Sequence, residues 1–173
     1  SKILVFPSGI RDSSPRMIRF AKDPNRAYVI TEESNEINEY PNECAPERPV
    51  FEEIQTVPSV NKEDGRNGCA ASGMEISADG KYLFCSNAGA NSVMIYEIDG
   101  ESGELTEVCE SKISGDYPKT LAIFPDGKHF VSLNHDTNEI TTFKVDYDKK
   151  YFLMMDKPIS IDQPNCIHIH KLV

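Results

Sequence analysis

The sequence lacks the short motifs that mark the common classes of enzyme. It contains no Gly-x-Ser-x-Gly nucleophile elbow, no cysteine within a recognisable cysteine–histidine motif and no glycine-rich phosphate loop. No apolar run approaches the roughly 18 residues of a membrane-spanning helix. The first residues also lack the long apolar region of a signal peptide. We therefore expect a cytoplasmic globular protein with no membrane partner and no serine or cysteine nucleophile.

Basic residues are also scarce. The 173 residues include 18 Lys and Arg against 28 Asp and Glu, which gives a net charge of −10. Nucleic acids and anionic membranes select basic surfaces, so this balance disfavours both as partners. An anionic small molecule would need a local cluster of Arg and Lys.

The five cysteines show no pairing pattern. They are Cys44, Cys69, Cys85, Cys109 and Cys166, an odd number without a CxxC pair and without the spacing of zinc ligands. We expect reduced thiols and no metal. Cys85 and Cys166 lie in apolar strand patterns, so both are expected to be buried as small hydrophobic side chains.

What the sequence does contain is one pattern written three times. It reads apolar strand, tight turn, aromatic strand, polar loop, and then a strand that opens with Asn. Asp79-Gly80-Lys81 and Asp126-Gly127-Lys128 form the turns of the clearest copies and lie 47 residues apart, as do Asn91 and Asn138. A degenerate copy runs from 18 to 37. A period in the forties with several strands per repeat predicts a β-propeller.

Each full repeat resolves into four antiparallel strands. In the last repeat these are expected at 119–124, 129–133, 139–145 and 151–161, joined by Pro, Asp, Gly and Asn turns. Such a four-stranded unit is a propeller blade. No helical period extends beyond about two turns, so the fold class is all-β.

The repeats also predict the domain organisation, and the expected divisions are the end of an earlier blade (1–14), a blade (15–60), a loop (61–70), a blade (71–116), a blade (117–162) and a closing strand (163–173). Three blades cannot close a ring, because propellers have at least about four. We therefore expect this chain to associate with the remaining half of a propeller or with a second copy of itself.

The repeats resemble the lactonase family of seven-bladed propellers, which includes the propeller-type 6-phosphogluconolactonases and the carboxymuconate lactonising enzymes. The resemblance covers essentially the whole chain and suggests its C-terminal portion. It rests on the phrases Ser14-Pro15-Arg16, Ala27-Tyr28-Val29-Ile30-Thr31-Glu32, Ser77-Ala78-Asp79-Gly80-Lys81-Tyr82-Leu83-Phe84-Cys85-Ser86-Asn87, Asp116-Tyr117-Pro118 and Pro164-Asn165-Cys166-Ile167.

The resemblance implies a site at one mouth of the central channel, built from a His, two Arg and a Glu. Arg16 matches one family Arg and Glu32 matches the Glu, whereas Lys119 stands where a further family Arg is found. We assign Arg16 and Glu32 to catalysis. Substrate binding is assigned to Lys119, His135, Asn87 and Asn134. The chain departs from the family phrases at Met17 and Glu75, which replace His, and at Ala88, which replaces Arg; the catalytic His would lie on an earlier blade.

The resemblance implies hydrolysis of a sugar-acid lactone such as 6-phosphogluconolactone, without metal or cofactor. Arg16 would hold the substrate anion or polarise its carbonyl, and Glu32 would handle the proton. The alternatives are a muconate-type lactonising enzyme and a non-catalytic scaffold that binds a small ligand or a protein. Arg16 and Glu32 could equally form a structural ion pair. His168 and His170 share one face of a predicted strand but lack a third metal ligand.

Overall fold

The computed structural model describes residues 13–21, 25–41, 53–61 and 68–170, which form thirteen β-strands and no helix. Nothing in these ranges could therefore serve as a membrane-crossing helix. The strands form three sheets in which paired strands are antiparallel and follow chain order, except that β13 pairs with β11. The all-β prediction and the division into four-stranded antiparallel units are confirmed.

The first sheet consists of β1 (Pro15–Ala21), β2 (Arg26–Thr31), β3 (Glu36–Pro41) and β4 (Gln55–Pro58). The second consists of β5 (Ala70–Ile76), β6 (Tyr82–Ala88), β7 (Ser92–Ile98) and β8 (Leu105–Lys112). The third consists of β9 (Pro118–Ile123), β10 (His129–Asn134), β11 (Glu139–Asp146), β12 (Tyr151–Met154) and β13 (Ile159–Ser160).

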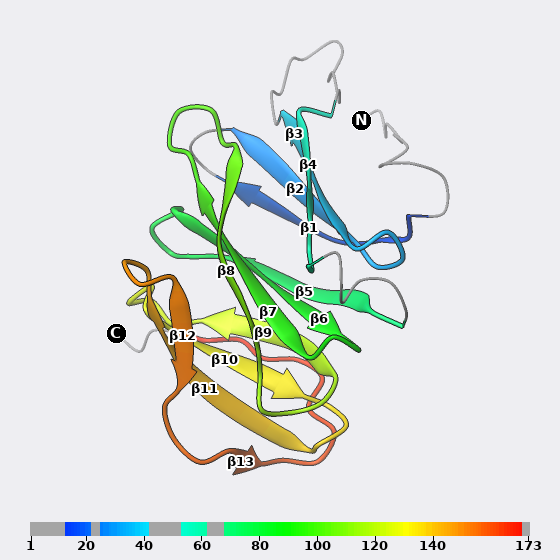
Figure 1. Ribbon diagram of the computed structural model, residues 1–173, viewed down its shortest axis with the longest axis vertical. Helices are drawn as coiled ribbons and strands as arrows, with labels where there is room; N and C mark the ends of the chain where they lie inside the picture. Colours follow the sequence, from blue (N-terminus) through cyan, green and yellow to red (C-terminus); the bar gives the residue numbers. More distant parts are fainter. Residues whose placement is uncertain (1–12, 22–24, 42–52, 62–67, 171–173) are drawn as a thin grey trace.

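The three sheets follow one another in space as they do in sequence (Figure 1). The first strand of each sheet contacts the first strand of the next, so that β5 lies between β1 and β9. This is the arrangement of successive propeller blades, in which the innermost strands line a common axis.

Apolar side chains fill both junctions between the sheets. Between the first and second sheets, Tyr28 and Ile37 pack in one cluster with Met74 and Leu83. Between the second and third, Phe84 meets the ring of Phe130 edge-on with 5.4 Å between centroids. Burial of both faces of the middle sheet explains why its inner strands are apolar throughout rather than alternating.

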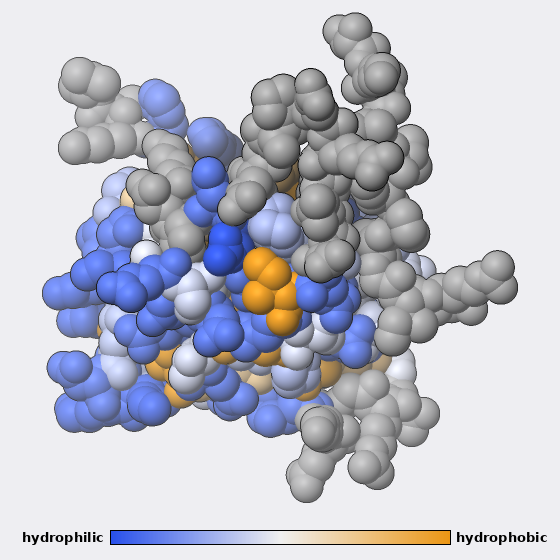
Figure 2. Space-filling model, turned by 90° about the horizontal axis from the view of Figure 1, so that it is seen from above, coloured by the Kyte–Doolittle hydropathy of each residue, from blue (hydrophilic) through white to orange (hydrophobic). Residues whose placement is uncertain are grey.

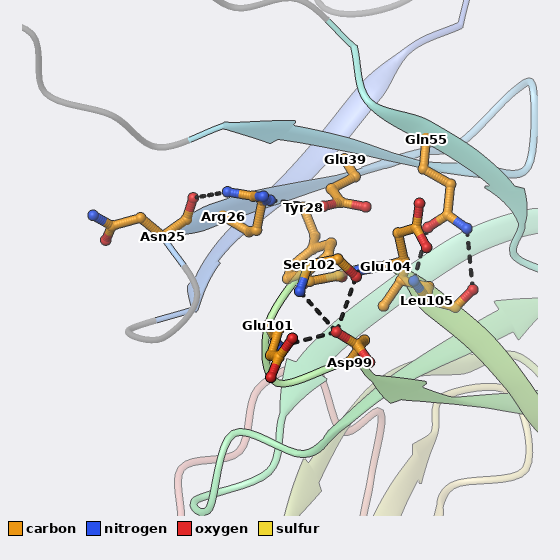
Figure 3. A network of polar contacts seen from close by, with 11 residues as sticks. Asn25, Arg26, Tyr28, Glu39, Gln55, Asp99, Glu101, Ser102, Glu104 and Leu105 are labelled. Carbon is orange, nitrogen blue, oxygen red and sulfur yellow. Dashed lines mark hydrogen bonds and ion pairs between the residues drawn. The ribbon is translucent and has the colours of Figure 1, made fainter.

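A polar network also joins the first sheet to the second at the ends away from the β2–β3 turn (Figure 3). Gln55 bonds both backbone groups of Leu105, donating to the carbonyl at 3.1 Å and accepting from the amide at 2.8 Å. Tyr28 donates its hydroxyl to the carbonyl of Gly103 at 2.7 Å. The Glu39 side chain is fully buried and accepts from Nε of Arg26 at 3.0 Å. Burial raises the pKa of Glu39, and the Arg26 charge partly opposes this.

The predicted outer strand 151–161 is divided in two. Both β12 and β13 pair with β11, and residues 155–158 between them form no strand. Pro158 has no amide hydrogen to donate, so a continuous ladder is interrupted just before β13.

The predicted closing strand 163–173 is not assigned as a strand over 163–170, which we call the C-terminal segment; 171–173 lie outside the described residues. Ile167 and Ile169 pack on Val131 and Leu133, on the face of the third sheet that points away from the second. Cys166 alternates with these isoleucines and is exposed, so the prediction of its burial is wrong. Cys85 is buried as expected.

The outward faces of the first and last sheets leave large apolar side chains in contact with solvent. They include Ile18 and Phe20 on β1, and Leu153 and Ile159 on β12 and β13. Seen from above, the surface is largely hydrophilic but carries a compact apolar patch beside the residues drawn in grey (Figure 2). Most of the predicted end of an earlier blade, 1–14, and residues 62–67 of the predicted loop 61–70 lie outside the described residues.

Candidate functional site

A cleft of about 550 Å³ runs along the innermost strands β1, β5 and β9 and the C-terminal segment. Its lining includes the residue at the same position of four successive repeats. These are Arg16, Ser72, Lys119 and Asn165. The repeat phase therefore brings one side chain from each inner segment to the same level of the cleft, and we call these four residues the upper level.

A second level follows three residues further along each segment. It consists of Arg19, Glu75, Ala122 and His168, all of which line the same cleft. Arg19 donates from Nε to Oε2 of Glu75 at 2.8 Å, which joins the first sheet to the second. We call these four residues the lower level.

Arg16, at the upper level, is in direct contact with Glu32, which does not itself line the cleft. The Nη1 atom of Arg16 donates to Oε2 of Glu32 at 2.6 Å, and its Nε donates to the carbonyl of Ser72 at 2.8 Å. The pair is half-exposed, with side-chain exposures of 28% and 39%. Because the guanidinium is bonded on two sides, its orientation is fixed relative to both sheets.

The β1–β2 pairing explains why these two residues meet. Pro15 is paired with Thr31, and the register shifts between Pro15 and Met17, so that Arg16 occupies a bulge. The amide of Glu32 donates to the carbonyl of Ser14 at 2.8 Å, which places the carboxylate beside the bulge. Bulges commonly re-aim a side chain in this way at the end of a strand.

The same backbone arrangement recurs at the third sheet, where Lys119 and His135 take the positions of Arg16 and Glu32. The amide of His135 donates to the carbonyl of Tyr117 at 3.0 Å. The Tyr117 ring is close to both side chains, with its centroid 5.4 Å from Nζ of Lys119 and 6.1 Å from the ring centroid of His135. His135 itself is 3.0 Å from Asp136 and is not part of the cleft lining.

An asparagine in the turn between the second and third strands of each sheet bonds the backbone at or near the start of the next inner segment. Asn35, Asn91 and Asn138 all have positive φ, between 52° and 55°, in the turn between the second and third strands. Asn91 accepts from the amide of Tyr117 at 2.9 Å, and Asn138 accepts from that of Gln163 at 2.9 Å. Asn tolerates this left-handed conformation better than most residues, so each turn can reach the inner segment of the next blade.

Asn87 and Asn134 lie inside the blades, and both are fully buried. The amide of Asn87 donates to the carbonyl of Ser59 at 2.6 Å, and that of Asn134 donates to Oγ1 of Thr141 at 3.1 Å. Neither residue lines the cleft. Of the predicted site residues, Arg16 and Lys119 line the cleft, and Glu32 contacts Arg16. Catalysis by Arg16 and Glu32, and substrate binding by Lys119, Asn87, Asn134 and His135, stay predictions.

The charges in the cleft differ from those of the chain as a whole. Arg16 and Arg19 are each paired with a carboxylate, whereas Lys119 forms no ion pair within the described part of the chain. Among the Lys and Arg side chains that the structure describes, only Lys119 therefore faces the cleft without an ion pair, in a protein with a net charge of −10. In the same described ranges, no cluster of three or more His, Cys, Asp or Glu could hold a metal ion.

Sequence reasoning missed several residues of the cleft, among them Arg19, Asn165 and His168. The signal that could have found them is the phase of the repeat, because each occupies the position of another cleft residue in a neighbouring blade or lies beside one. Glu75 stood out in the sequence only as a replacement, and its pairing with Arg19 depends on contact between two blades.

Comparison with known proteins identifies a family. Residues 10–169 match the family model described as lactonase, 7-bladed beta-propeller. The 6-phosphogluconolactonase of Bacillus subtilis (strain 168) is 28% identical over 155 residues, which are 90% of this chain and 44% of that protein. The crystal structure of a protein from Bacteroides fragilis, named as a candidate 6-phosphogluconolactonase, is 30% identical with a TM-score of 0.76, covering 89% of this chain and 41% of that chain.

The periplasmic gluconolactonase of Pseudomonas aeruginosa has a TM-score of 0.78 at 23% identity, covering 89% of this chain and 42% of that chain; at this identity the likeness concerns the fold alone. The chain thus spans less than half the length of the relatives it matches. Because the family model covers nearly the whole sequence and the sheets have the matching architecture, the chain belongs to the lactonase family of seven-bladed β-propellers.

Proposed function

We propose that this chain is part of a lactonase that hydrolyses a sugar-acid lactone such as 6-phosphogluconolactone. The observation that carries the proposal is the contact of Glu32 with Arg16, because Arg16 lines the same cleft as Lys119. The name of the Bacillus subtilis relative gives the substrate class. The location of the protein in the cytoplasm remains a prediction.

Each residue has a role that its position allows. The guanidinium of Arg16 polarises the lactone carbonyl and stabilises the oxyanion that forms on it. Glu32 takes a proton from the attacking water and delivers it to the ring oxygen as the ring C–O bond breaks. Lys119 attracts the anionic group of the substrate, because no carboxylate of the described residues neutralises it.

The experiment compares hydrolysis of 6-phosphogluconolactone by the full-length protein with spontaneous hydrolysis in buffer. We expect Arg16→Ala to lower kcat/KM by about 100-fold or more, as for loss of an oxyanion donor. Arg16→Lys, which keeps the charge but loses the planar fork, should recover only part of the rate. Lys119→Ala removes the cation that attracts the substrate anion. Lys81→Ala, which removes a lysine from an exposed turn, is its matched control. A wild-type rate equal to that of buffer would refute the proposal.

A non-catalytic scaffold is the second candidate, and the replacements at Met17, Glu75 and Ala88 favour it. It predicts binding of an anionic ligand without turnover. The same assay run with a muconate-type lactone tests the lactonising alternative.

A further inference from the structure

The Arg19–Glu75 pair lies in the cleft without a role in the chemistry described above. Arg19 uses Nε for Glu75 and Nη1 for the carbonyl of Ile18 at 3.1 Å. Oε1 of Glu75 has no hydrogen-bond partner among the described residues, and the two side chains are 36% and 38% exposed. The pair therefore presents both donors and an acceptor to whatever occupies the lower level.

The balance of charge indicates what kind of ligand group suits this pair. The guanidinium of Arg19 is already neutralised by Glu75, so a second anion at the lower level would meet a carboxylate as well as a cation. A hydroxyl group suits the pair better, because it can donate to Oε1 of Glu75 and accept from Arg19 at once. Hydrogen bonds to charged groups are also stronger than those between neutral groups.

The dimensions fit a substrate of sugar-acid length. Three residues along an extended strand advance roughly 10 Å, and the bulge at Arg16 shortens this on β1. A six-carbon polyhydroxylated molecule can therefore contact both levels of the cleft, whereas a small lactone without a hydroxylated chain can reach only one.

We propose that Arg19 and Glu75 determine substrate specificity by binding the hydroxyl groups of a polyhydroxylated lactone whose one anionic group is held by Lys119. The identification of the ligand as a lactone rests on the proposed function. The expectation of a polyhydroxylated ligand with one anionic group does not. The proposal also distinguishes hydrolysis of a sugar lactone from the lactonising of a muconate. A muconate-type dicarboxylate has no hydroxyl to donate, and Glu75 would repel its second carboxylate.

The kinetic test uses the full-length protein and two phosphorylated lactones, 6-phosphogluconolactone and an analogue that lacks the ring hydroxyls. We expect Glu75→Ala to lower kcat/KM for the hydroxylated lactone by roughly tenfold to a hundredfold and to leave that for the analogue nearly unchanged. For the hydroxylated lactone, the kcat/KM of Glu75→Gln should lie between those of the wild type and Glu75→Ala. Glu97→Gln, an exposed carboxylate on β7, is the control. An equal loss for both lactones would show that Glu75 only holds the blades together and would overturn the proposal.

A binding test keeps the inference separate from catalysis. Glucitol 6-phosphate and hexyl phosphate carry the same anionic group, but only the first has hydroxyls. Calorimetry should show tighter binding of glucitol 6-phosphate, with the difference removed by Glu75→Ala and both affinities weakened by Lys119→Ala. Hydroxyl discrimination without lactone turnover would refute the proposed function alone. Equal affinity of the wild-type protein for the two phosphates would refute the specificity proposal alone.

Discussion

Arg16 and Glu32 face each other at 2.6 Å because a bulge in β1 turns the arginine toward the end of β2. Their contact is not an isolated surface ion pair, since Nε of Arg16 is also bonded to the carbonyl of Ser72 in the next sheet. The position of the guanidinium therefore depends on two blades. Any function of Arg16 at this end of the cleft therefore depends on how the two blades pack.

Proton transfer by the Glu32 carboxylate can be tested while its bond to Arg16 is kept. We expect Glu32→Gln to lower kcat for lactone hydrolysis by about 10²–10⁴-fold with little change in KM, because the variant still bonds Arg16 but cannot accept a proton. Steady-state kinetics on the full-length protein measure this, with thermal unfolding as the check on folding. Wild-type kcat in the variant would leave the pair a purely structural role.

Gly73 allows β5 and β9 to approach closely. A Cβ added there would lie 2.8 Å from Cα of Thr120, which is backbone and cannot move aside. We expect Gly73→Ala to reduce the free energy of unfolding by about 1–3 kcal/mol through overpacking. Gly100→Ala, where nothing lies within 4 Å, is the matched control. Equal urea denaturation midpoints for the two variants would contradict the close approach.

The turn at Asn91 combines a backbone and a side-chain requirement. Its φ is 52°, and its amide group bonds Asp116 at 2.6 Å and Tyr117 at 2.9 Å. Asn91→Gly keeps the conformation but loses both bonds, so we expect a loss of about 1–3 kcal/mol. Asn91→Ala should lose about 1 kcal/mol more, because alanine is strained at positive φ. Chemical denaturation of both variants distinguishes the two contributions, and identical stabilities would rule out the backbone term.

Glu39 should make stability depend on pH. Burial raises its pKa above the ordinary value of 4.5, despite the opposing charge of Arg26. The folded state then keeps a proton that the unfolded state has released, so the free energy of unfolding should fall as pH rises from that ordinary value toward the raised one. Glu39→Gln cannot ionise and should show a shallower fall between mildly acidic and neutral pH. Curves that run parallel for wild type and variant would contradict this, and Glu97→Gln serves as the exposed control.

The outward faces of the end sheets should drive association. Ile18 and Phe20 on β1, and Leu153 and Ile159 at the other end, are all exposed. We expect this 19.4 kDa chain to run on size exclusion above the position of a compact monomer unless the rest of a ring is supplied. Phe20→Ser should shift it toward smaller species. A stable, compact monomer of the unchanged chain would argue against this prediction.

The repeat allowed much of the local structure to be predicted. The Asp-Gly-Lys turns and the alternating strands specify hairpins through short-range hydrogen bonds, which depend little on the rest of the molecule. Two predictions that rested on hydropathy alone were wrong. Pro158 divided an outer strand that hydropathy alone made continuous. Cys166 became exposed because its isoleucine neighbours took the buried face.

The sequence by itself determined the all-β class, the blade repeat and the family, and it singled out Arg16 and Glu32 as a candidate pair. Only the tertiary structure decided that Arg19 meets Glu75 and that Asn87 and Asn134 are buried inside the blades. It also decided that Lys119 lies over the ring of Tyr117 and has no carboxylate partner among the residues that the structure describes. The physical reason is the range of the forces involved. Strand pairing within a blade is encoded over about 40 residues. The phase of the repeat indicates which positions reach the cleft, but which of those side chains pair with one another depends on how separate blades pack.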